Sequence, residues 1–455
     1  MLSTLHVFGL LVISAWLACR LLVALTYSSL SSKLPAAHWS CHLSARWFDR
    51  KCTTVGELKT LYAVHARLGP IVRLGSNEVS VVSQEGLKKI YAGGLDKSDW
   101  YEQSFRVYGV QNLVCTLDHK THSAVRKMIA GLYTKSYLQH SEDLARLSKR
   151  IISDRLLSNL SRCGQVAQGM DVVKLFECVG VDFITGHIFG NTAGTDFLGD
   201  QVSQDRYFGE WNKLRESPHL TDKPVTESLY MGMCEAAISS SKESMAGQES
   251  RPNVVAKMYK EMSSKAQHWN MTEGEVITRC ASEMVDHVIA TQETNTITWT
   301  YILYRLSQRP ELQRMLRAEL STLRRDTTHH DDNEALPSPA SIENLPLLNA
   351  TVLETLRLHA ANPARMRRVV SSAGLHLHGY FIPPGTIISS NAYCLHRNED
   401  VFSKPLDWLP ERWLSASKIE VGEVGASGAC ALRKWFWAFG SGPRGCIGQH
   451  FALQS

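Results

Sequence analysis

The sequence predicts a mainly helical α+β fold with small β-sheets near both ends and an apolar helix at its start. Three observations lead to this prediction. Between about residues 120 and 320, apolar residues recur mostly three and four positions apart, which is typical of helices packed on a core. Two short stretches, one near each end, are instead rich in Val and Ile and read as strands. The chain also opens with a nearly unbroken apolar run.

Composition and charge exclude some classes of protein. The chain has 455 residues, of which 44% are hydrophobic and 20% are charged, as expected of a globular protein with a large core. The net charge is +5, and Lys and Arg are scattered rather than arranged in a basic stripe, so nucleic-acid binding is not indicated. The 11 cysteines include no CxxC pair and no zinc-finger spacing. Their odd number and irregular spacing indicate reduced thiols in a cytosol-facing domain.

The apolar run at the start extends from Leu2 to Tyr27 and is interrupted by Arg20. No Lys or Arg precedes it, whereas basic residues such as Lys33 follow it. This length suits one membrane span, and the charge asymmetry places the remainder on the cytosolic side. We expect a membrane anchor and hinge over residues 1–32 and one catalytic domain over residues 33–455. A cleaved signal peptide and a buried first helix are the alternatives.

The remaining elements follow from local patterns. The stretch 70–82 is expected to be a β-hairpin with its turn near residues 75–77. Helices are expected at 278–306, 311–323 and 342–359, and a short meander of strands at 367–391. The polar stretch 324–341 is expected to be a loop. Its run His329-His330-Asp331-Asp332 is a poor metal site, because adjacent residues in a loop give poor ligand geometry.

The strongest chemical signal is the segment Phe439-Gly-Ser-Gly-Pro-Arg444-Gly-Cys446-Ile-Gly448. Its glycines let the backbone approach a bound group closely and adopt positive φ. Backbone N–H groups and a following helix start would favour the thiolate of Cys446 over the thiol. A thiolate is a strong axial ligand for haem iron, and Arg444 could donate hydrogen bonds to a haem propionate. The alternative is a glycine-rich turn with a buried thiol.

At this segment the sequence resembles the cytochrome P450 superfamily, and the resemblance covers nearly the whole chain in order. Glu354-Thr-Leu-Arg357 is similar to the ExxR element of that family, and Pro410-Glu-Arg412-Trp413 is similar to its PERF/PERW segment. The resemblance implies the cytochrome P450 fold and a Glu–Arg–Arg network in which Arg412 completes the pair. It also implies haem b, with Cys446 as the axial ligand of the iron.

Further cofactor-binding residues are implied by the resemblance. His122 and Arg126 match the WxxxR helix of the family, with His in place of Trp, and would bind a propionate. Arg365 lies where the family often supplies another propionate ligand, although Arg367 and Arg368 leave the register open. Phe439 opens the cysteine segment and is expected to contact the haem.

The helix at 278–306 contains Ala290-Thr-Gln-Glu293-Thr294-Asn295, which resembles the family pattern AGx(D/E)TT. The resemblance implies that Glu293 and Thr294 are catalytic and deliver protons to iron-bound oxygen. A helical threonine that donates to its own i−4 carbonyl is the alternative. Two departures concern oxygen activation: Thr291 replaces a glycine, and Asn295 replaces the second threonine.

The resemblance implies a monooxygenase that uses molecular oxygen to oxidise a small apolar organic substrate. The chain has no Gly-rich dinucleotide fingerprint, so NADPH electrons are expected from a separate membrane-bound reductase. The motif style is similar to fungal microsomal members of secondary metabolism, which implies a single-pass protein of the endoplasmic reticulum bilayer. Because nine residues follow Cys446, the family's C-terminal sheet is expected to be missing. A haem-thiolate isomerase or dehydratase, or an inactive truncated product, is the alternative.

Overall fold

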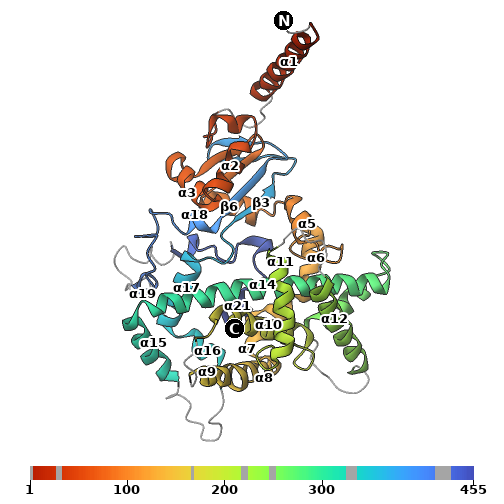
Figure 1. The fold of residues 1–455 in the computed structure, drawn as a ribbon, viewed down its shortest axis with the longest axis vertical. Coiled ribbons are helices and arrows are strands. Elements are labelled where there is room, and N and C mark those ends of the chain that lie inside the picture. Colours follow the sequence, from red (N-terminus) through yellow and green to blue (C-terminus); the bar gives the residue numbers. More distant parts are fainter. Residues whose placement is uncertain are drawn as a thin grey trace. The chain divides into compact units, whose positions relative to one another are not determined.

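The computed structural model describes residues 4–26, 33–164, 169–216, 224–244, 253–323, 336–415 and 432–454 (Figure 1). The chain forms two compact units. The sheet unit consists of residues 1–98, 362–407 and 427–445, and the helical unit consists of residues 99–361, 408–426 and 446–455. The helix-rich architecture with small sheets confirms the predicted fold class. The predicted boundary at residue 33 stays a prediction.

The sheet unit is built on a four-stranded sheet in the order β1-β2-β6-β3. Its strands and those of a separate two-stranded sheet are β1 (Ile71–Gly75), β2 (Glu78–Val81), β3 (Arg365–Val369), β6 (Ile387–Asn391), β4 (Leu375–Leu377) and β5 (Tyr380–Ile382). β1 and β2 form the predicted hairpin. β2 pairs with β6 in parallel, and this pairing joins segments about 300 residues apart into one sheet.

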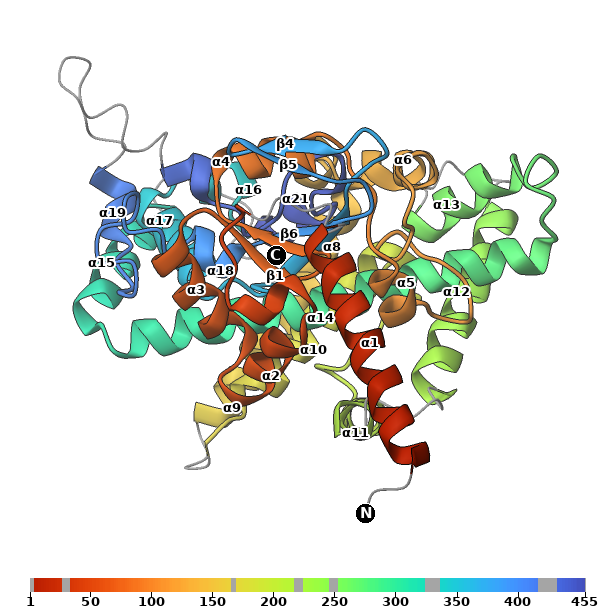
Figure 2. The same ribbon diagram turned by 90° about the horizontal axis from the view of Figure 1, so that it is seen from above.

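Helices complete the sheet unit, all of them short except α1. They are α1 (Thr4–Thr26), η1 (Trp39–His42), α2 (Arg46–Thr54), α3 (Glu57–Leu68), α4 (Gln84–Gly86), η2 (Leu87–Ala92), α18 (Ala392–Leu395) and η5 (Gly442–Arg444). α2 and α3 pack against β1, as Figure 2 shows from above. Phe48, Leu61 and Val72 are fully buried in the core between them.

The predicted apolar helix at the start forms as α1. Its side chains from Leu10 to Leu17 are largely exposed, with Leu11 at 62% and Trp16 at 60%. Within the described part of the chain, no helix has both the length and the apolar character that a membrane crossing requires. The predicted transmembrane helix is therefore not supported.

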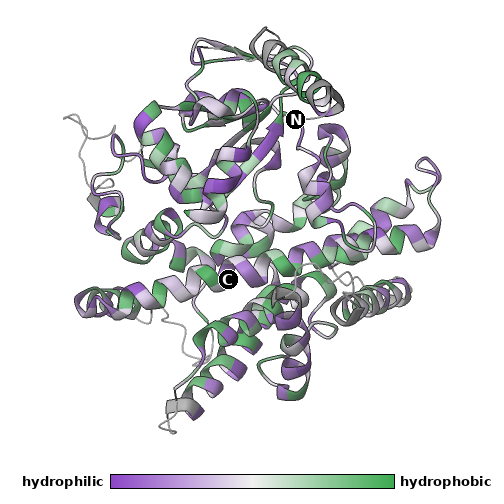
Figure 3. Cartoon of the chain, turned by 45° about the horizontal axis from the view of Figure 1, so that its top comes forward, coloured by the Kyte–Doolittle hydropathy of each residue, from purple (hydrophilic) through white to green (hydrophobic). Residues whose placement is uncertain are grey.

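The helical unit holds most of the helices. They are α5 (Trp100–Phe105), α6 (His119–Ile129), η3 (Ala130–Tyr133), α7 (Lys135–Gln139), α8 (Glu142–Ser148), η4 (Lys149–Leu156), α9 (Leu157–Gly164), α10 (Val172–Phe189), α11 (Gln201–Glu216), α12 (Pro224–Ser244), α13 (Val254–Ser263), α14 (Glu273–Ser307), α15 (Pro310–Leu323), α16 (Pro339–Glu343), α17 (Pro346–Leu358), α19 (Glu411–Ser415) and α21 (Gln449–Gln454). Apolar and polar residues both occur along the helices (Figure 3), as expected where one face of a helix is buried and the other is exposed.

The long helix α14 is the centre of this unit. It packs against α10, α12, α13 and α17. A capping box of Thr272 and Glu275 starts it, and this start precedes the predicted one at Thr278. α10 is buried along most of its length because it lies beside α14 within the main hydrophobic core. α14 thus offers a rigid platform for any site on its surface.

Two smaller predictions have different outcomes. The predicted loop 324–341 lies mostly outside the described residues, and its last part begins α16, which Ser338 caps. The run from His329 to Asp332 also lies outside the described residues. Among the residues that are described, no cluster of His, Cys, Asp or Glu could hold a metal ion.

Candidate active site

A buried charge network in the helical unit surrounds Glu354. Its carboxylate accepts from Arg357 Nε at 2.9 Å and Arg357 Nη2 at 2.7 Å, and both side chains are fully buried. Arg412 Nε donates to Glu354 Oε1 at 3.1 Å, so the predicted Glu–Arg–Arg network is present. A buried ion pair is favourable only when further hydrogen bonds satisfy its remaining groups.

Two further donors satisfy this carboxylate. The backbone N–H of Leu409 donates to Glu354 Oε1 at 2.9 Å, and Trp413 Nε1 donates to Oε2 at 2.9 Å. Trp408 Nε1 donates to the hydroxyl of Thr355 at 3.0 Å, on the next residue of the same helix. Trp413 thereby joins α19 to α17, and Trp408 joins the segment before α19 to the same helix. The roles of Trp408 and Trp413 were not predicted, although both lie in or beside the PERW segment.

Cys446 begins the last stretch of the helical unit. Its side chain is accessible, yet enough protein surrounds it that burial raises the pKa of the thiol. The backbone N–H of Gly448 and the charge of Arg126 lower this pKa, whereas Asp286 raises it. The sulfur is thus accessible to a metal, and the N–H donor and the guanidinium offset part of the cost of burying a thiolate charge.

One face of α14 is accessible in the middle of an otherwise buried stretch. Ala290 is exposed, and Asp286 and Thr294 are partly exposed, whereas Gln292 and Asn295 are buried. Asp286, Ala290 and Thr294 are spaced four residues apart and therefore share this face. Because Asp286 acts on the pKa of Cys446, the accessible face lies on the side of that thiol. Asp286 was not predicted, although the spacing of four could have identified it.

The predicted acid–alcohol pair lies on or beside this face. Thr294 Oγ1 donates to the carbonyl of Ala290 at 2.8 Å, which is the alternative that the sequence left open. Glu293 is partly exposed. α14 continues without a break through this segment. Gln292, the residue before Glu293, is buried, and its Oε1 accepts from the hydroxyl of Tyr207 at 2.8 Å.

His122 and Arg126 are four residues apart on α6 and share one face of it. Asp118 caps the helix by accepting from the N–H of Thr121. His122 is buried at 3% exposure, and Arg126 is partly exposed. Burial lowers the pKa of Arg126, and the neighbouring Cys446 raises it. The structure thus brings Arg126 near Cys446, and its role as a propionate ligand stays a prediction.

The glycine-rich part of the cysteine segment belongs to the sheet unit. Gly442 has φ +71°, and a Cβ there would lie 2.3 Å from the carbonyl oxygen of Tyr91, so only glycine fits. Trp437 Nε1 donates to Ser441 Oγ at 2.8 Å, and the rings of Trp437 and Tyr91 lie 4.6 Å apart. Phe439, the predicted haem contact, is partly buried between these anchors.

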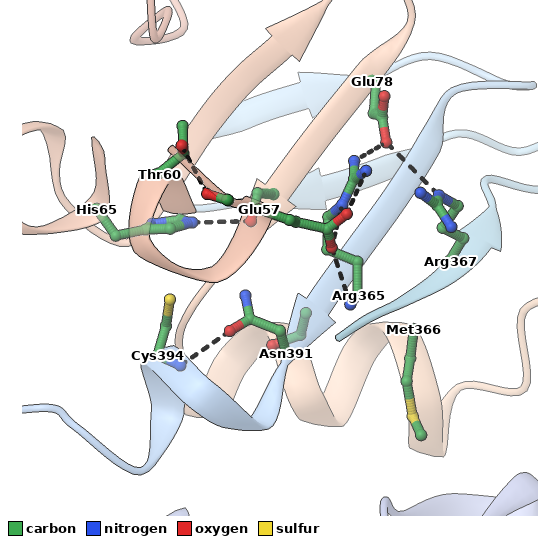
Figure 4. Close-up of polar contacts among 12 residues, drawn as sticks. Glu57, Thr60, His65, Glu78, Arg365, Met366, Arg367, Asn391 and Cys394 are labelled. Carbon is green, nitrogen blue, oxygen red and sulfur yellow. Dashed lines mark hydrogen bonds and ion pairs between the residues drawn. The ribbon is translucent and has the colours of Figure 1, made fainter. Parts of the chain in front are cut away.

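The predicted role of Arg365 as a propionate ligand stays a prediction, and in the structure its guanidinium contacts two carboxylates and an aromatic ring. Its Nε donates to Glu57 at 3.0 Å, its Nη1 donates to Glu78, and its guanidinium stacks over Phe48 at 4.6 Å. Figure 4 shows Arg365 and Arg367 directed toward Glu78 and Met366 directed to the other side of β3. Arg365 thus has two carboxylate partners within the sheet unit.

Arg368, another of the three arginines, lies on the opposite face of β3 from Arg365. In a strand, alternate residues face the same side, so Arg368 shares its face with Met366. The sulfur of Met366 lies beside Gly440 of the cysteine segment. Arg368 is buried at 4% exposure and stacks over Tyr91 at 5.0 Å. Arg444 is also buried, with its side chain at 3% exposure and its Nη2 3.9 Å from Asp96.

Comparison with known proteins agrees with these motifs. The cytochrome P450 family model matches residues 55–455. The chain belongs to the cytochrome P450 family.

Three relatives of this chain come from fungi. Cytochrome P450 monooxygenase avaI of Aspergillus versicolor is 28% identical over 403 residues, which cover 85% of this chain and 92% of the relative. Cytochrome P450 monooxygenase stcB of Emericella nidulans is 27% identical and covers 86% of this chain and 73% of the relative. Pisatin demethylase of Fusarium vanettenii is 26% identical and covers 94% and 82%. This P450 is therefore an oxidoreductase of the monooxygenase type.

The family implies haem with cysteine ligation, and the residues of the helical unit fit such a group. The sulfur of Cys446 is accessible rather than enclosed by side chains. A Cβ added at Gly448 would meet only that sulfur, at 4.0 Å, so no bulk adjoins the ligand on that side. The exposed Ala290 leaves room on the accessible face of α14. Arg126 would supply a cation for a propionate.

Proposed function

We propose that this P450 is a haem-thiolate monooxygenase in which Cys446 ligates the iron of haem b and a small apolar organic molecule is oxidised. The accessible, N–H-bonded sulfur of Cys446 is the observation that carries this proposal. The fungal origin of its relatives supports a place in fungal secondary metabolism.

The proposal gives each candidate residue a role. When bound, thiolate-ligated haem supplies the activation of molecular oxygen. Gly448 N–H and Arg126 stabilise the negative charge on Cys446 Sγ. Within the helical unit, Arg126 and His122 would hold a propionate.

Proton delivery is assigned to the accessible face of α14. The hydroxyl of Thr294 would release its hydrogen bond to Ala290 and pass a proton from ordered water, with the carboxylate of Glu293 behind it. The exposed position of Ala290 supports access of water to this hydroxyl.

The test of haem ligation is the difference spectrum of the reduced protein with carbon monoxide. The red-shifted Soret band of a thiolate-ligated haem is expected for the parent and absent for Cys446→Ser. Cys52→Ser is the control, because Cys52 is another partly exposed free thiol, on α2 of the sheet unit. Retention of the band in Cys446→Ser, or its absence from the parent, would overturn the proposal.

A second candidate function keeps the haem but uses no external oxygen, as in a haem-thiolate isomerase or dehydratase. The hydrogen bond from Thr294 to Ala290 and the unbroken α14 favour it, because both leave the proton pathway closed. The two functions differ in stoichiometry. A monooxygenase consumes one oxygen molecule and one NADPH per product, whereas turnover without either supports the second candidate.

Electrons for the monooxygenase would come from a separate membrane-bound NADPH-dependent reductase, and we place the protein at the endoplasmic reticulum membrane. The exposed apolar side chains of α1 support this location. Fractionation of cells tests it. Recovery of the full chain in the microsomal pellet is expected, and recovery in the supernatant together with a chain lacking residues 1–32 would contradict it.

A further inference from the structure

A hydrogen-bonded chain of three buried side chains crosses the helical unit beside Cys446. The hydroxyl of Tyr133 lies 2.6 Å from His287 Nδ1, and His287 Nε2 lies 3.2 Å from Glu283 Oε1. The backbone N–H of Leu113 donates to Glu283 Oε2 at 2.7 Å. Tyr133, His287 and Glu283 are 3%, 7% and 0% exposed. None of these residues has a part in the chemistry described above.

One protonation pattern satisfies every member of this chain. A neutral His287 accepts from the Tyr133 hydroxyl at Nδ1 and donates from Nε2–H to the Glu283 carboxylate. Burial, and then the charges of Glu283 and Cys446, raise the pKa of Tyr133 well above its usual value, so its phenol keeps the proton that it donates. These hydrogen bonds to His287 and Glu283 therefore fix the orientation of the Tyr133 ring relative to α14.

The rings of Tyr133 and His187 form the site against which α21 packs, and we call this site the slot of α21. Phe451 of α21 is 5% exposed and packs edge-on against Tyr133, with ring centroids 6.4 Å apart. His187 of α10 closes the slot by stacking on Phe451 at 5.0 Å and contacting Tyr133 at 5.1 Å. The helical hydrogen bond from Ala452 N–H to the Gly448 carbonyl, at 2.8 Å, links this anchor to the turn that follows Cys446.

We propose that Tyr133, His287 and Glu283 are positioning residues that hold α21 in its slot and thereby fix the presentation of the Cys446 sulfur. His287 and Glu283 both belong to α14, so the same hydrogen bonds set the position of Cys446 relative to the accessible face of α14. The importance of the sulfur rests on the function proposed above, whereas the docking of α21 does not.

Tyr133→Phe tests the proposal because it removes one hydroxyl and keeps the ring. Tyr207→Phe is its matched control. Tyr207 is also 3% exposed, and its hydroxyl also donates to a residue of α14, Gln292, at 2.8 Å. This hydroxyl accepts from Tyr230 at 2.7 Å, and the ring of Tyr207 packs beside Phe197, Phe208 and Trp211. Phe451→Leu removes the anchoring ring but keeps an apolar side chain.

Hydrogen exchange of the peptide 447–454, read by mass spectrometry, measures the docking directly with or without haem. Loss of one buried hydrogen bond should speed exchange of this peptide about tenfold in Tyr133→Phe and less than about twofold in Tyr207→Phe. Tyr133→Phe should add little to Phe451→Leu, because both act on one contact, whereas Tyr207→Phe should be additive with it.

The carbon monoxide difference spectrum supplies the second readout. Tyr133→Phe should lower the fraction of haem that gives the thiolate band, and Tyr207→Phe should leave that fraction unchanged. Equal exchange of the peptide in the two tyrosine variants would overturn the positioning role, even if the parent shows a normal thiolate band. A parent without a thiolate band but with faster exchange in Tyr133→Phe would refute the proposed function and keep the positioning role.

Discussion

Two tryptophans that donate to neighbouring residues of α17 allow a comparison of stability between a hydrogen bond to a charged acceptor and one to a neutral acceptor. Trp413 and Trp408 are 8% and 6% exposed, and each donates one indole N–H at 2.9 or 3.0 Å. The acceptor of Trp413 is the carboxylate of Glu354, and that of Trp408 is the hydroxyl of Thr355. A bond to a charged group contributes about 1.5–3 kcal/mol, against about 0.5–1.5 kcal/mol for a neutral pair.

Trp413→Phe and Trp408→Phe remove the same atoms, so the loss of ring volume is nearly equal in both. Trp413→Phe should therefore lower the free energy of unfolding by about 1–1.5 kcal/mol more than Trp408→Phe. Urea unfolding followed by far-UV circular dichroism measures this difference without relying on tryptophan fluorescence. An equal loss in the two variants, or a larger one in Trp408→Phe, would refute the view that Trp413 stabilises the buried charge of Glu354.

Two further predictions concern the sheet unit and the start of α21. Gly442→Ala should lower the free energy of unfolding by at least about 2 kcal/mol, because φ is +71° and its Cβ would lie 2.3 Å from the Tyr91 carbonyl oxygen. Gly448→Ala is the control and should lower it by less than about 1 kcal/mol, because its Cβ would meet only the sulfur of Cys446, at 4.0 Å. Burial lowers the pKa of His65 from 6.5 to about 4. Between these two pH values His65 binds a proton in the unfolded chain but not in the folded protein. The free energy of unfolding should therefore fall as the pH falls from 7 to 5, by about 2 kcal/mol more in the parent than in His65→Gln. Equal pH dependence in urea unfolding of parent and variant would contradict this.

The sequence predicted the parts of the site whose geometry is local. Glu354 and Arg357 lie three residues apart, and a helix alone places them together. Arg412 joins them from a distant segment, and its prediction depended on the order of the motifs rather than on spacing. The hairpin of β1 and β2 was likewise predicted from its own residues. The parallel pairing of β2 with β6 was not, because nothing in either strand specifies a partner about 300 residues away.

The facing of Arg365 shows most clearly what the sequence alone leaves open. Successive residues of a strand point to opposite faces, so an error of one or three positions exchanges the two sides of the sheet. The pairing of Arg365 with Asn391 sets the facing of β3, and β6 lies more than 20 residues further along the chain. Three arginines within four positions could not be separated without that pairing. Asp286 is the opposite case, since its spacing of four from Ala290 was visible in the sequence. What was missing there was which face of α14 is accessible, and only the packing of α10, α12, α13 and α17 around that helix determines it.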